Sequence, residues 1–276
     1  MTRPFSILAL GIISVFISFN TTGCANQTDI ATMPVEPSTP AAPAFSIPES
    51  LLAFDATIPV LLFHYIEPAE NTAPGNALAI TPEQLESYLS YFHNKQIETI
   101  TFRDLKQIIE GNRSLPERAV ILTFDDGYAN QYQYAFPLLE RYAMRGVFFI
   151  ITEKPDADPA YMTWEQIKTL SDAGHEIGSH SVAHPDLTAL QPDRLEEELA
   201  TSRSSIERII GLPVLTFCYP SGQYNDQVLA AVRDQYLFAR STQPGSNIAL
   251  DRRYEMPALR VTATVPAFSL GELFTK

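Results

Sequence analysis

The alternation of two kinds of segment constrains the fold of this chain more than any other feature. From Ile58 onward, short apolar runs typical of buried strands alternate with longer amphipathic segments of helical period. The strand-like runs lie at residues 58–65, 97–102, 119–124, 146–152, 175–179, 213–220, 236–240 and 258–263. The helical segments include residues 82–95, 131–144, 163–174 and 192–211. This order predicts an α/β domain with a parallel sheet and helices outside it, and about seven or eight units can close the sheet into a barrel.

Composition and charge exclude two other classes of protein. The 276 residues are 45% hydrophobic and 18% charged, which is ordinary for a domain with a core and excludes disorder throughout the chain. The formal net charge is -13 and the sequence contains no basic stripe, so we expect no nucleic-acid partner. A neutral or cationic substrate suits this charge better.

The first 24 residues have the pattern of an export signal. Arg3 precedes an apolar run at residues 5–19, which is short for a membrane-spanning helix, and small residues lead to Cys24. Small residues before a cysteine resemble a bacterial lipoprotein cleavage site, although Thr21 stands where such sites usually carry Leu. We therefore expect an exported protein that faces the periplasm or the cell exterior and is attached to a membrane by a lipid on Cys24. Plain cleavage and an uncleaved anchor are the alternatives.

Residues 25–50 separate this signal from the rest of the chain. They are rich in Pro, Ala, Thr and Ser, and they show neither the helical nor the strand period. Such a segment buries no core and is expected to form an extended tether, which leaves residues 51–276 as one domain. The second cysteine, Cys218, lies in an apolar run and is interpreted as a small buried side chain.

Two neighbouring carboxylates, Asp125 and Asp126, directly follow the strand predicted at residues 119–124. Side chains alternate along a strand, so the two should leave its end in different directions and can have separate tasks. The carboxyl ends of parallel strands are also where the active sites of α/β proteins lie. The alternative is an ordinary turn, because Asp, Asp and Gly are common where strands end.

A second polar group follows the strand predicted at residues 175–179. His180 and His184 are separated by three residues, so one helical turn or a tight loop would bring both imidazoles to the same side. Two histidines and one carboxylate form the ligand set of an open catalytic metal site. An isolated pair at this spacing is usually structural, but its place after a strand end, in a chain with only 5 histidines, favours metal binding.

Three motifs, TFDDGY, SHSVAH and FCYPSG, occur in this order between Ala119 and Phe238. Together they resemble the NodB-like polysaccharide deacetylases, carbohydrate esterase family 4, and GVFFIIT and MTWEQIKTLSDAGHEIGSH are similar to the family's connecting segments. IPVLLFHYI resembles the opening strand of the poly-N-acetylglucosamine deacetylase branch. The resemblance places the core motifs at residues 118–240 and implies that residues 51–276 form a distorted (β/α) barrel of about seven parallel strands.

The resemblance also assigns roles to the matched residues. Asp126, His180 and His184 would hold a divalent metal, usually zinc in this family, and Asp125 would be the general base. A metal suits the reaction because an amide carbonyl is a poor electrophile, which a metal polarises while it lowers the pKa of bound water. In the third motif, a backbone N–H near Ser221 would stabilise the oxyanion.

Two departures from the family pattern require other residues. Cys218 stands where many members have the Arg that orients the catalytic Asp. Arg260 is our first candidate to replace that Arg and Arg240 the second, although each can equally be an ordinary strand-end arginine. No histidine follows His184, so the late histidine that protonates the leaving amine is absent. In the branch with a similar opening strand, an N-terminal histidine takes the place of the late one, and His64 matches it. The alternative is that His64 has only a structural role.

Four aromatic side chains near strand ends are candidate contacts for a sugar face: Tyr65, Tyr128, Tyr219 and Tyr224. Rings stack well on the apolar face of a pyranose, but the same side chains can equally pack in the core or at the rim. The two remaining histidines, His93 and His175, are interpreted as structural.

These residues predict a metal-dependent hydrolase that removes N-acetyl groups from a polysaccharide containing N-acetylglucosamine. Two alternatives stay open. The same chemistry can remove O-acetyl groups from xylan or another glycan, and the sequence does not separate this from the first reading. A barrel without the family Arg and the late His can instead be an inactive, lipid-tethered glycan-binding protein, although the retained carboxylates and imidazoles argue against it.

Overall fold

A computed structural model describes residues 54–73 and 75–274, and the predicted export signal and the predicted tether lie outside these residues. Its centre is a curled sheet of parallel strands in the order β10-β9-β8-β7-β6-β2-β12, with β5 (Glu98–Thr99) paired to the start of β6. In that order, the bounds are Phe238–Arg240, Thr216–Cys218, Glu176–Ser179, Val147–Ile150, Ala119–Phe124, Val60–Phe63 and Leu259–Arg260. The predicted parallel fold of about seven strands is therefore confirmed, as a curled half-barrel.

One irregular segment spans the gap between the two edge strands, β10 and β12. Met256 forms a parallel bridge with Arg240, at the end of β10. A few residues further on, Leu259 and Arg260 of β12 pair with β2 instead. The sheet is therefore closed unevenly, which is the distortion that the predicted barrel fold implied.

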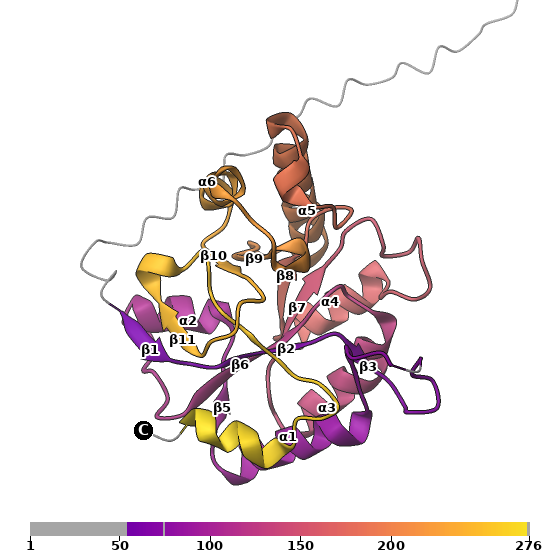
Figure 1. Ribbon diagram of the computed structural model, residues 1–276, viewed down its shortest axis with the longest axis vertical. Helices are drawn as coiled ribbons and strands as arrows, with labels where there is room; N and C mark the ends of the chain where they lie inside the picture. Colours follow the sequence, from indigo (N-terminus) through magenta and orange to yellow (C-terminus); the bar gives the residue numbers. More distant parts are fainter. Residues whose placement is uncertain (1–53, 74, 275–276) are drawn as a thin grey trace, which may run out of the picture. The chain divides into compact units, whose positions relative to one another are not determined.

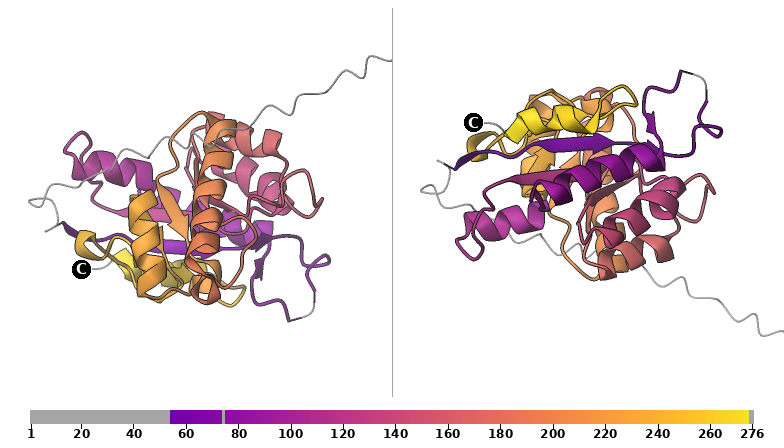
Figure 2. Two further views of the ribbon diagram at one scale, coloured as in Figure 1. Left: turned by 90° about the horizontal axis from the view of Figure 1, so that it is seen from above. Right: turned by 90° about the horizontal axis from the view of Figure 1, so that it is seen from below.

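Helices surround the strands on the outside, as Figures 1 and 2 show from three directions. In the described part of the chain, the α-helices are α1 (Pro82–Asn94), α2 (Phe102–Ile109), α3 (Phe136–Arg141), α4 (Trp164–Asp172), α5 (Pro192–Ile210) and α6 (Asp226–Gln235). Three of them begin at a threonine cap with a reciprocal capping box: Thr81, Thr101 and Thr163. Within the two described ranges, no helix is both long and apolar enough to cross a membrane.

Most observed strands are shorter than the predicted runs, and two predicted elements differ for a local reason. The strand expected at residues 97–102 ends after Thr99, because Thr101 caps α2 through reciprocal hydrogen bonds with Asp104. The helix expected at residues 131–144 is divided into a π-helical turn, Gln131–Ala135, and α3. Two short pairs lie outside the main sheet: β1 (Asp55–Thr57) with β11 (Asn247–Ala249), and β3 (Tyr65–Ile66) with β4 (Ala79–Ile80).

The strands β2, β6, β7, β8, β9 and β10 are buried on both faces, which explains their almost continuous apolar sequences. All residues of β6 are buried, and they alternate between two clusters. Val120, Leu122 and Phe124 pack in a cluster with side chains of every α-helix except α2, whereas Ala119 and Ile121 pack in a second cluster with side chains of α2. The odd-numbered positions, Ala119, Ile121 and Thr123, form an inner series, and Asp125, directly after β6, continues it.

Candidate active site

A left-handed turn separates the two neighbouring aspartates at the end of β6. Asp125 follows the inner series, whereas Asp126 has a φ of 72° and Gly127 a φ of 81°. A Cβ at Gly127 would lie 3.1 Å from Ile150 Cδ1, so glycine suits both the dihedral angle and the space. The turn considered as an alternative is thus present, and it directs the two carboxylates toward different partners.

Asp126, His180 and His184 come together as one potential metal-binding group. Asp126 Oδ1 lies 3.3 Å from His180 Nε2 and 3.8 Å from His184 Nε2. The ligand atoms of all three lie within 4.8 Å of one another, a spacing that allows one divalent ion to contact them all. Burial raises the pKa of Asp126, but the hydrogen bond and charge of His180 outweigh it and hold the pKa below its usual range, so the carboxylate is ionised.

A hydrogen bond fixes how His180 presents its ring. Its Nδ1 lies 2.7 Å from the carbonyl oxygen of Cys218, which can only accept, so Nδ1 carries the proton. Nε2 is then the ring nitrogen that faces Asp126, and it becomes a metal ligand when it gives up its proton. The donor set therefore fits a divalent metal.

The loop that carries His184 is held in an unusual conformation. Ser181 and His184 have φ values of 65° and 59°, and the His184 N–H donates to Ser181 Oγ at 2.9 Å. The buried carboxylate of Glu198, on α5, accepts the N–H groups of Val182 and Ala183 at 2.9 Å and 3.0 Å. Left-handed residues persist where their surroundings hold them, and they cluster at functional sites. Glu198 is such a support, and the sequence motifs did not identify it.

Asp125 is held by a buried arginine from another strand. Arg240, the last residue of β10, donates from Nη2 to Asp125 Oδ1, and its side chain is fully enclosed. The strand register pairs Arg240 with Cys218, the last residue of β9. An arginine on the neighbouring strand, β10, therefore makes the contact with Asp125 that an arginine at position 218 makes in many members of the family. A charge-assisted hydrogen bond of this kind fixes the orientation of the carboxylate.

The structure does not bring Arg260, the first candidate for this contact, to Asp125. Arg260 lies on the edge strand β12 with an exposed side chain. Within the described residues, its side chain forms no hydrogen bond or ion pair. The expectation for Arg260 is thus corrected, and Arg240, the second candidate, makes the contact.

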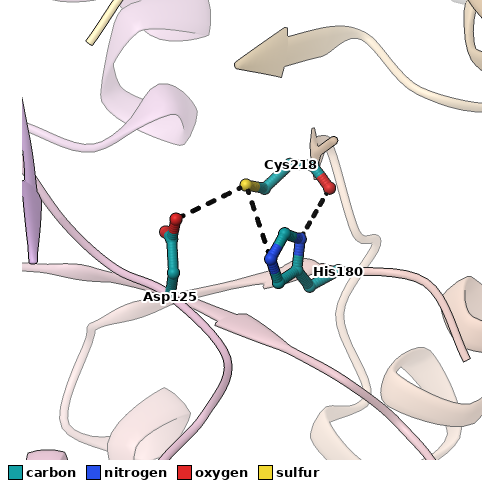
Figure 3. Close-up of side chains that lie close together, drawn as sticks. All are labelled: Asp125, His180 and Cys218. Atoms are coloured by element: carbon teal, nitrogen blue, oxygen red, sulfur yellow. Dashed lines mark hydrogen bonds between the residues drawn. The ribbon is translucent and has the colours of Figure 1, made fainter. Parts of the chain in front are cut away.

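Cys218 belongs to this polar group and is more than a packing residue. Its Sγ lies 2.8 Å from Arg240 Nη2, 3.7 Å from Asp125 Oδ2 and 3.9 Å from His180 Nε2. Figure 3 shows the sulfur between the carboxylate of Asp125 and the imidazole of His180. Cys218 is fully buried, as the sequence predicts, but it contacts groups from both predicted functional motifs.

His64 lies beside Asp125 because of the register of β2 and β6. Phe63 and Phe124 are paired at the ends of the two strands. The residues that follow them, His64 and Asp125, therefore lie next to each other. His64 Nε2 lies 4.0 Å from Asp125 Oδ2. Burial lowers the pKa of His64 against the opposing effect of the Asp125 charge, which favours the neutral imidazole.

One side chain ties these two strand ends together. Gln131 is fully buried in the π-helical turn, and its Nε2 donates to the carbonyl oxygens of His64 at 2.8 Å and of Asp125 at 2.5 Å. π-Helical turns are frequent at functional sites. Gln131 was missed from the sequence because it lies in an expected helix and matches no motif.

The third motif forms a tight turn after β9. Ser221 lies at its centre with a φ of 55° and an exposed side chain. Tyr219, just before the turn, is fully buried and its hydroxyl donates to the carbonyl oxygen of Tyr254 at 2.9 Å. The predicted sugar contact of Tyr219 is therefore corrected, because its ring is part of the core. Tyr224 is half-buried, and its ring packs on Tyr219 at a centroid distance of 4.8 Å.

Tyr128 belongs to a stack of three half-buried rings next to the metal-binding group. Its ring centroid lies 4.0 Å from that of Tyr65 and 5.0 Å from that of Tyr161. Burial and the charge of Asp126 raise the pKa of Tyr128, so its hydroxyl stays protonated. Two of these rings were predicted as sugar contacts, and Tyr161 was not.

Comparison with known proteins adds independent information. A family model described as polysaccharide deacetylase matches residues 112–237, which include all three motifs. The YxkH protein of Bacillus subtilis is 28% identical over 217 residues, which are 78% of this chain and 75% of that protein. The peptidoglycan-N-acetylmuramic acid deacetylase PdaA of the same organism is 33% identical over 115 residues, which are 41% of this chain and 42% of that protein.

Two solved structures share the fold. The deacetylase PplD of Streptococcus pyogenes, in complex with acetate, has a TM-score of 0.75 at 24% identity and covers 81% of this chain and 100% of its own. A polysaccharide deacetylase of Bacillus cereus has a TM-score of 0.72 at 24% identity and covers 80% of this chain and 70% of its own. The motif match, the shared fold and the polar group at the strand ends agree: residues 112–237 match the polysaccharide deacetylase family, and the chain is similar to deacetylases of this family over most of the described residues.

Proposed function

We propose that this deacetylase removes N-acetyl groups from a polymer that contains N-acetylglucosamine, with a divalent metal, most simply Zn²⁺, held by Asp126, His180 and His184. The observation that carries the proposal is the separation of the two aspartates. Asp126 faces the two imidazoles, whereas Asp125 is held apart by Arg240. One carboxylate is thus available to bind metal while the other stays free to act as a base.

The first half of the reaction is proposed to rest on Asp125. A divalent ion bound at this place would polarise the acetyl carbonyl and lower the pKa of bound water. Asp125 Oδ2 accepts the proton of the attacking water, while Arg240 keeps the carboxylate oriented through Oδ1. A backbone N–H near Ser221, in the left-handed turn after β9, is the proposed donor to the oxyanion.

The second half of the reaction is proposed to rest on His64. Its lowered pKa makes the resting imidazole neutral, so it can receive the proton that Asp125 has taken from water. The 4.0 Å between His64 Nε2 and Asp125 Oδ2 requires only a small movement for this transfer. His64 then protonates the amine nitrogen as the C–N bond breaks, and the products are acetate and a free amine on the sugar. A positioned acid contributes about 10²–10⁴ in rate.

The substrate is proposed from the surroundings of this group. The stacked rings of Tyr65, Tyr128 and Tyr161 offer an apolar contact for a sugar face. The net charge of -13 suits a neutral polymer that becomes cationic as its acetyl groups are removed. PdaA, by its name, acts on the N-acetylmuramic acid of peptidoglycan, which supports an N-acetyl substrate here.

The test is acetate release by the zinc-loaded protein from three substrates: β-1,4-linked N-acetylglucosamine oligomers, β-1,6-linked oligomers and acetylated xylan. Acetate and free amine in equal amounts from an N-acetylglucosamine oligomer is the expected result. Acetate from xylan alone would replace the N-acetyl assignment with an O-acetyl esterase. No acetate from any of the three would contradict the proposed reaction.

We also propose export and attachment to a bacterial membrane through a lipid on Cys24. This rests on residues 1–24 of the sequence alone. The full chain and its Cys24→Ser variant can be compared after labelling of the producing bacteria with a radioactive fatty acid. We expect the label and the membrane location to be lost together in Cys24→Ser. An unlabelled wild-type chain would contradict the lipid.

A further inference from the structure

The active-site group contains a second set of potential metal ligands that overlaps the first. Asp125, His180 and Cys218 each offer one ligand atom, and the three atoms lie within 4.8 Å of one another (Figure 3). We propose that this set binds a thiophilic divalent cation, such as Cd²⁺, in a position that excludes the catalytic metal and inhibits the enzyme. The inhibition rests on the proposed function, whereas the binding does not.

The distances between the three ligand atoms suit one shared ion. Cys218 Sγ lies 3.7 Å from Asp125 Oδ2 and 3.9 Å from His180 Nε2. An ion with bonds of about 2.3 Å to sulfur and about 2.1 Å to nitrogen holds these atoms roughly 3.6 Å apart in a tetrahedral site. Shifts of a few tenths of an ångström are therefore enough to complete the set.

The two sets exclude each other because both depend on His180 Nε2. The Nδ1 atom of His180 is engaged with the carbonyl oxygen of Cys218, so Nε2 has the ring's one available lone pair. An ion on the second set removes His180 from Asp126 and His184. It also occupies Oδ2 of Asp125, the oxygen proposed to accept the proton from water. Binding there therefore removes the catalytic metal and the base together.

The charge of Arg240 decides which ions are able to bind. Its Nη2 lies 2.8 Å from Cys218 Sγ and also donates to Asp125, so a fixed positive charge opposes any incoming cation. Hard ions such as Mg²⁺ gain too little from sulfur to overcome this repulsion. A thiophilic ion forms a strong bond to the Cys218 thiolate, and the thiol proton is released to solvent as that bond forms.

Ultraviolet absorption of the full chain with Cys24→Ser tests the binding, because Cys218 is then the only thiol. Addition of Cd²⁺ is expected to produce a thiolate-to-cadmium charge-transfer band that saturates at about one ion per chain. The band should be absent when Cys218→Ser is added, with circular dichroism to confirm that this variant is folded. If it is not folded, Asp125→Asn replaces it, with an expected tenfold or greater loss of cadmium affinity. A Cys24→Ser chain without the band would overturn the proposal.

His184→Ala, in the Cys24→Ser chain, distinguishes the two sets because His184 belongs to the first set alone. The band should persist with the same stoichiometry. Loss of the band would mean that the sulfur joins an ion held by the first set, which contradicts a separate position.

In the zinc-loaded chain, Cd²⁺ should release zinc to a chromogenic chelator, and Cys218→Ser should raise the cadmium concentration for half-release at least tenfold. Equal release from both chains would also contradict the proposal. None of these readouts uses acetate, so they stand whether or not the proposed reaction does.

Discussion

Asp125 and Asp126 are neighbours in the chain, yet their partners are assembled in different ways. The partners of Asp126 are His180 and His184, which one short loop brings together. The partners of Asp125 come from the ends of three further strands: His64 after β2, Cys218 on β9 and Arg240 on β10. We name Asp126, His180 and His184 the metal-side group, and Asp125, His64, Cys218 and Arg240 the base-side group. A loop can build a ligand set locally, whereas the base-side group requires the whole sheet.

Arg240→Met should have the largest effect, and it should be confined to the base-side group. Removal of one partner of a buried ion pair leaves Asp125 unpaired in the interior, which costs about 3–5 kcal/mol of the free energy of unfolding. We expect that loss in urea denaturation and a fall in acetate release of about 100-fold or more, with metal content unchanged. The matched control is Arg260→Met, whose exposed side chain should change stability by less than about 0.5 kcal/mol. Similar effects of both variants would break the comparison.

Acid should destabilise the fold through His175, which belongs to neither group. This loss of stability sets the lowest pH at which the metal-side and base-side groups can be compared. Burial and the charge of Arg145 lower the pKa of His175 to about 4. The unfolded chain keeps the ordinary value of 6.5 and therefore binds a proton between pH 6.5 and 4 that the folded chain does not. The stability is complete above pH 6.5 and falls as the pH decreases toward 4, by up to about 3 kcal/mol.

His175→Gln isolates this effect, because it removes the titrating group and leaves the carboxylates in place. Free energies of unfolding in urea at pH 7.5 and 4.5 should differ less for His175→Gln than for the wild type. The same difference in both proteins would assign the acid sensitivity to other groups.

His64→Ala should reduce the rate without removing metal, because His64 lies against the carboxylate of Asp125 rather than in the metal-side group. We expect acetate release to fall about 100-fold, the usual scale for loss of a positioned acid. His93→Ala, on the exposed side of α1, is the control and should retain wild-type activity. A near-normal rate for His64→Ala would return His64 to a structural role.

Gln131→Ala should have the smallest effect and shows whether the base-side group depends on its backbone support. The variant leaves the carbonyl oxygens of His64 and Asp125 without their buried donor, at a cost of about 1–3 kcal/mol in unfolding free energy. A slight displacement of both strand ends should lower kcat about tenfold with little change in KM or metal content. Gln133→Ala, at an exposed neighbouring position, is the control. Loss of metal in Gln131→Ala would show that the two groups are not separate.

The fold and the metal-side group could be predicted because their signals are local. The strand at Ala119–Phe124 has the predicted bounds, since an apolar run of strand length ends at a turn. The spacing of His180 and His184 is contained in one loop, and no other strand is needed to interpret it. The expected strand at residues 97–102 was wrong in its second half because a threonine cap outweighed the apolar pattern.

The base-side group could not be predicted in full because it depends on strand register. Arg240 and Arg260 both end strands, and only the pairing of Arg240 with Cys218 selects the correct one. The sequence spacing between Cys218 and Asp125 likewise contains no sign of their contact. Glu198 left a weak local signal, because it shares a helix face with the buried Leu195 and Ser202. An acidic residue on an apolar face indicates a buried partner but does not name it.

The most direct measurement of the separation between the two aspartates is zinc content, with acetate release, for Asp125→Asn and Asp126→Asn side by side. Asp125→Asn should keep about one zinc ion per chain and lose turnover, because its carboxylate lies outside the metal-side group. Asp126→Asn should lose both, because it removes a ligand atom. Equal loss of zinc from the two variants would contradict the separation of the carboxylates on which the proposed reaction depends.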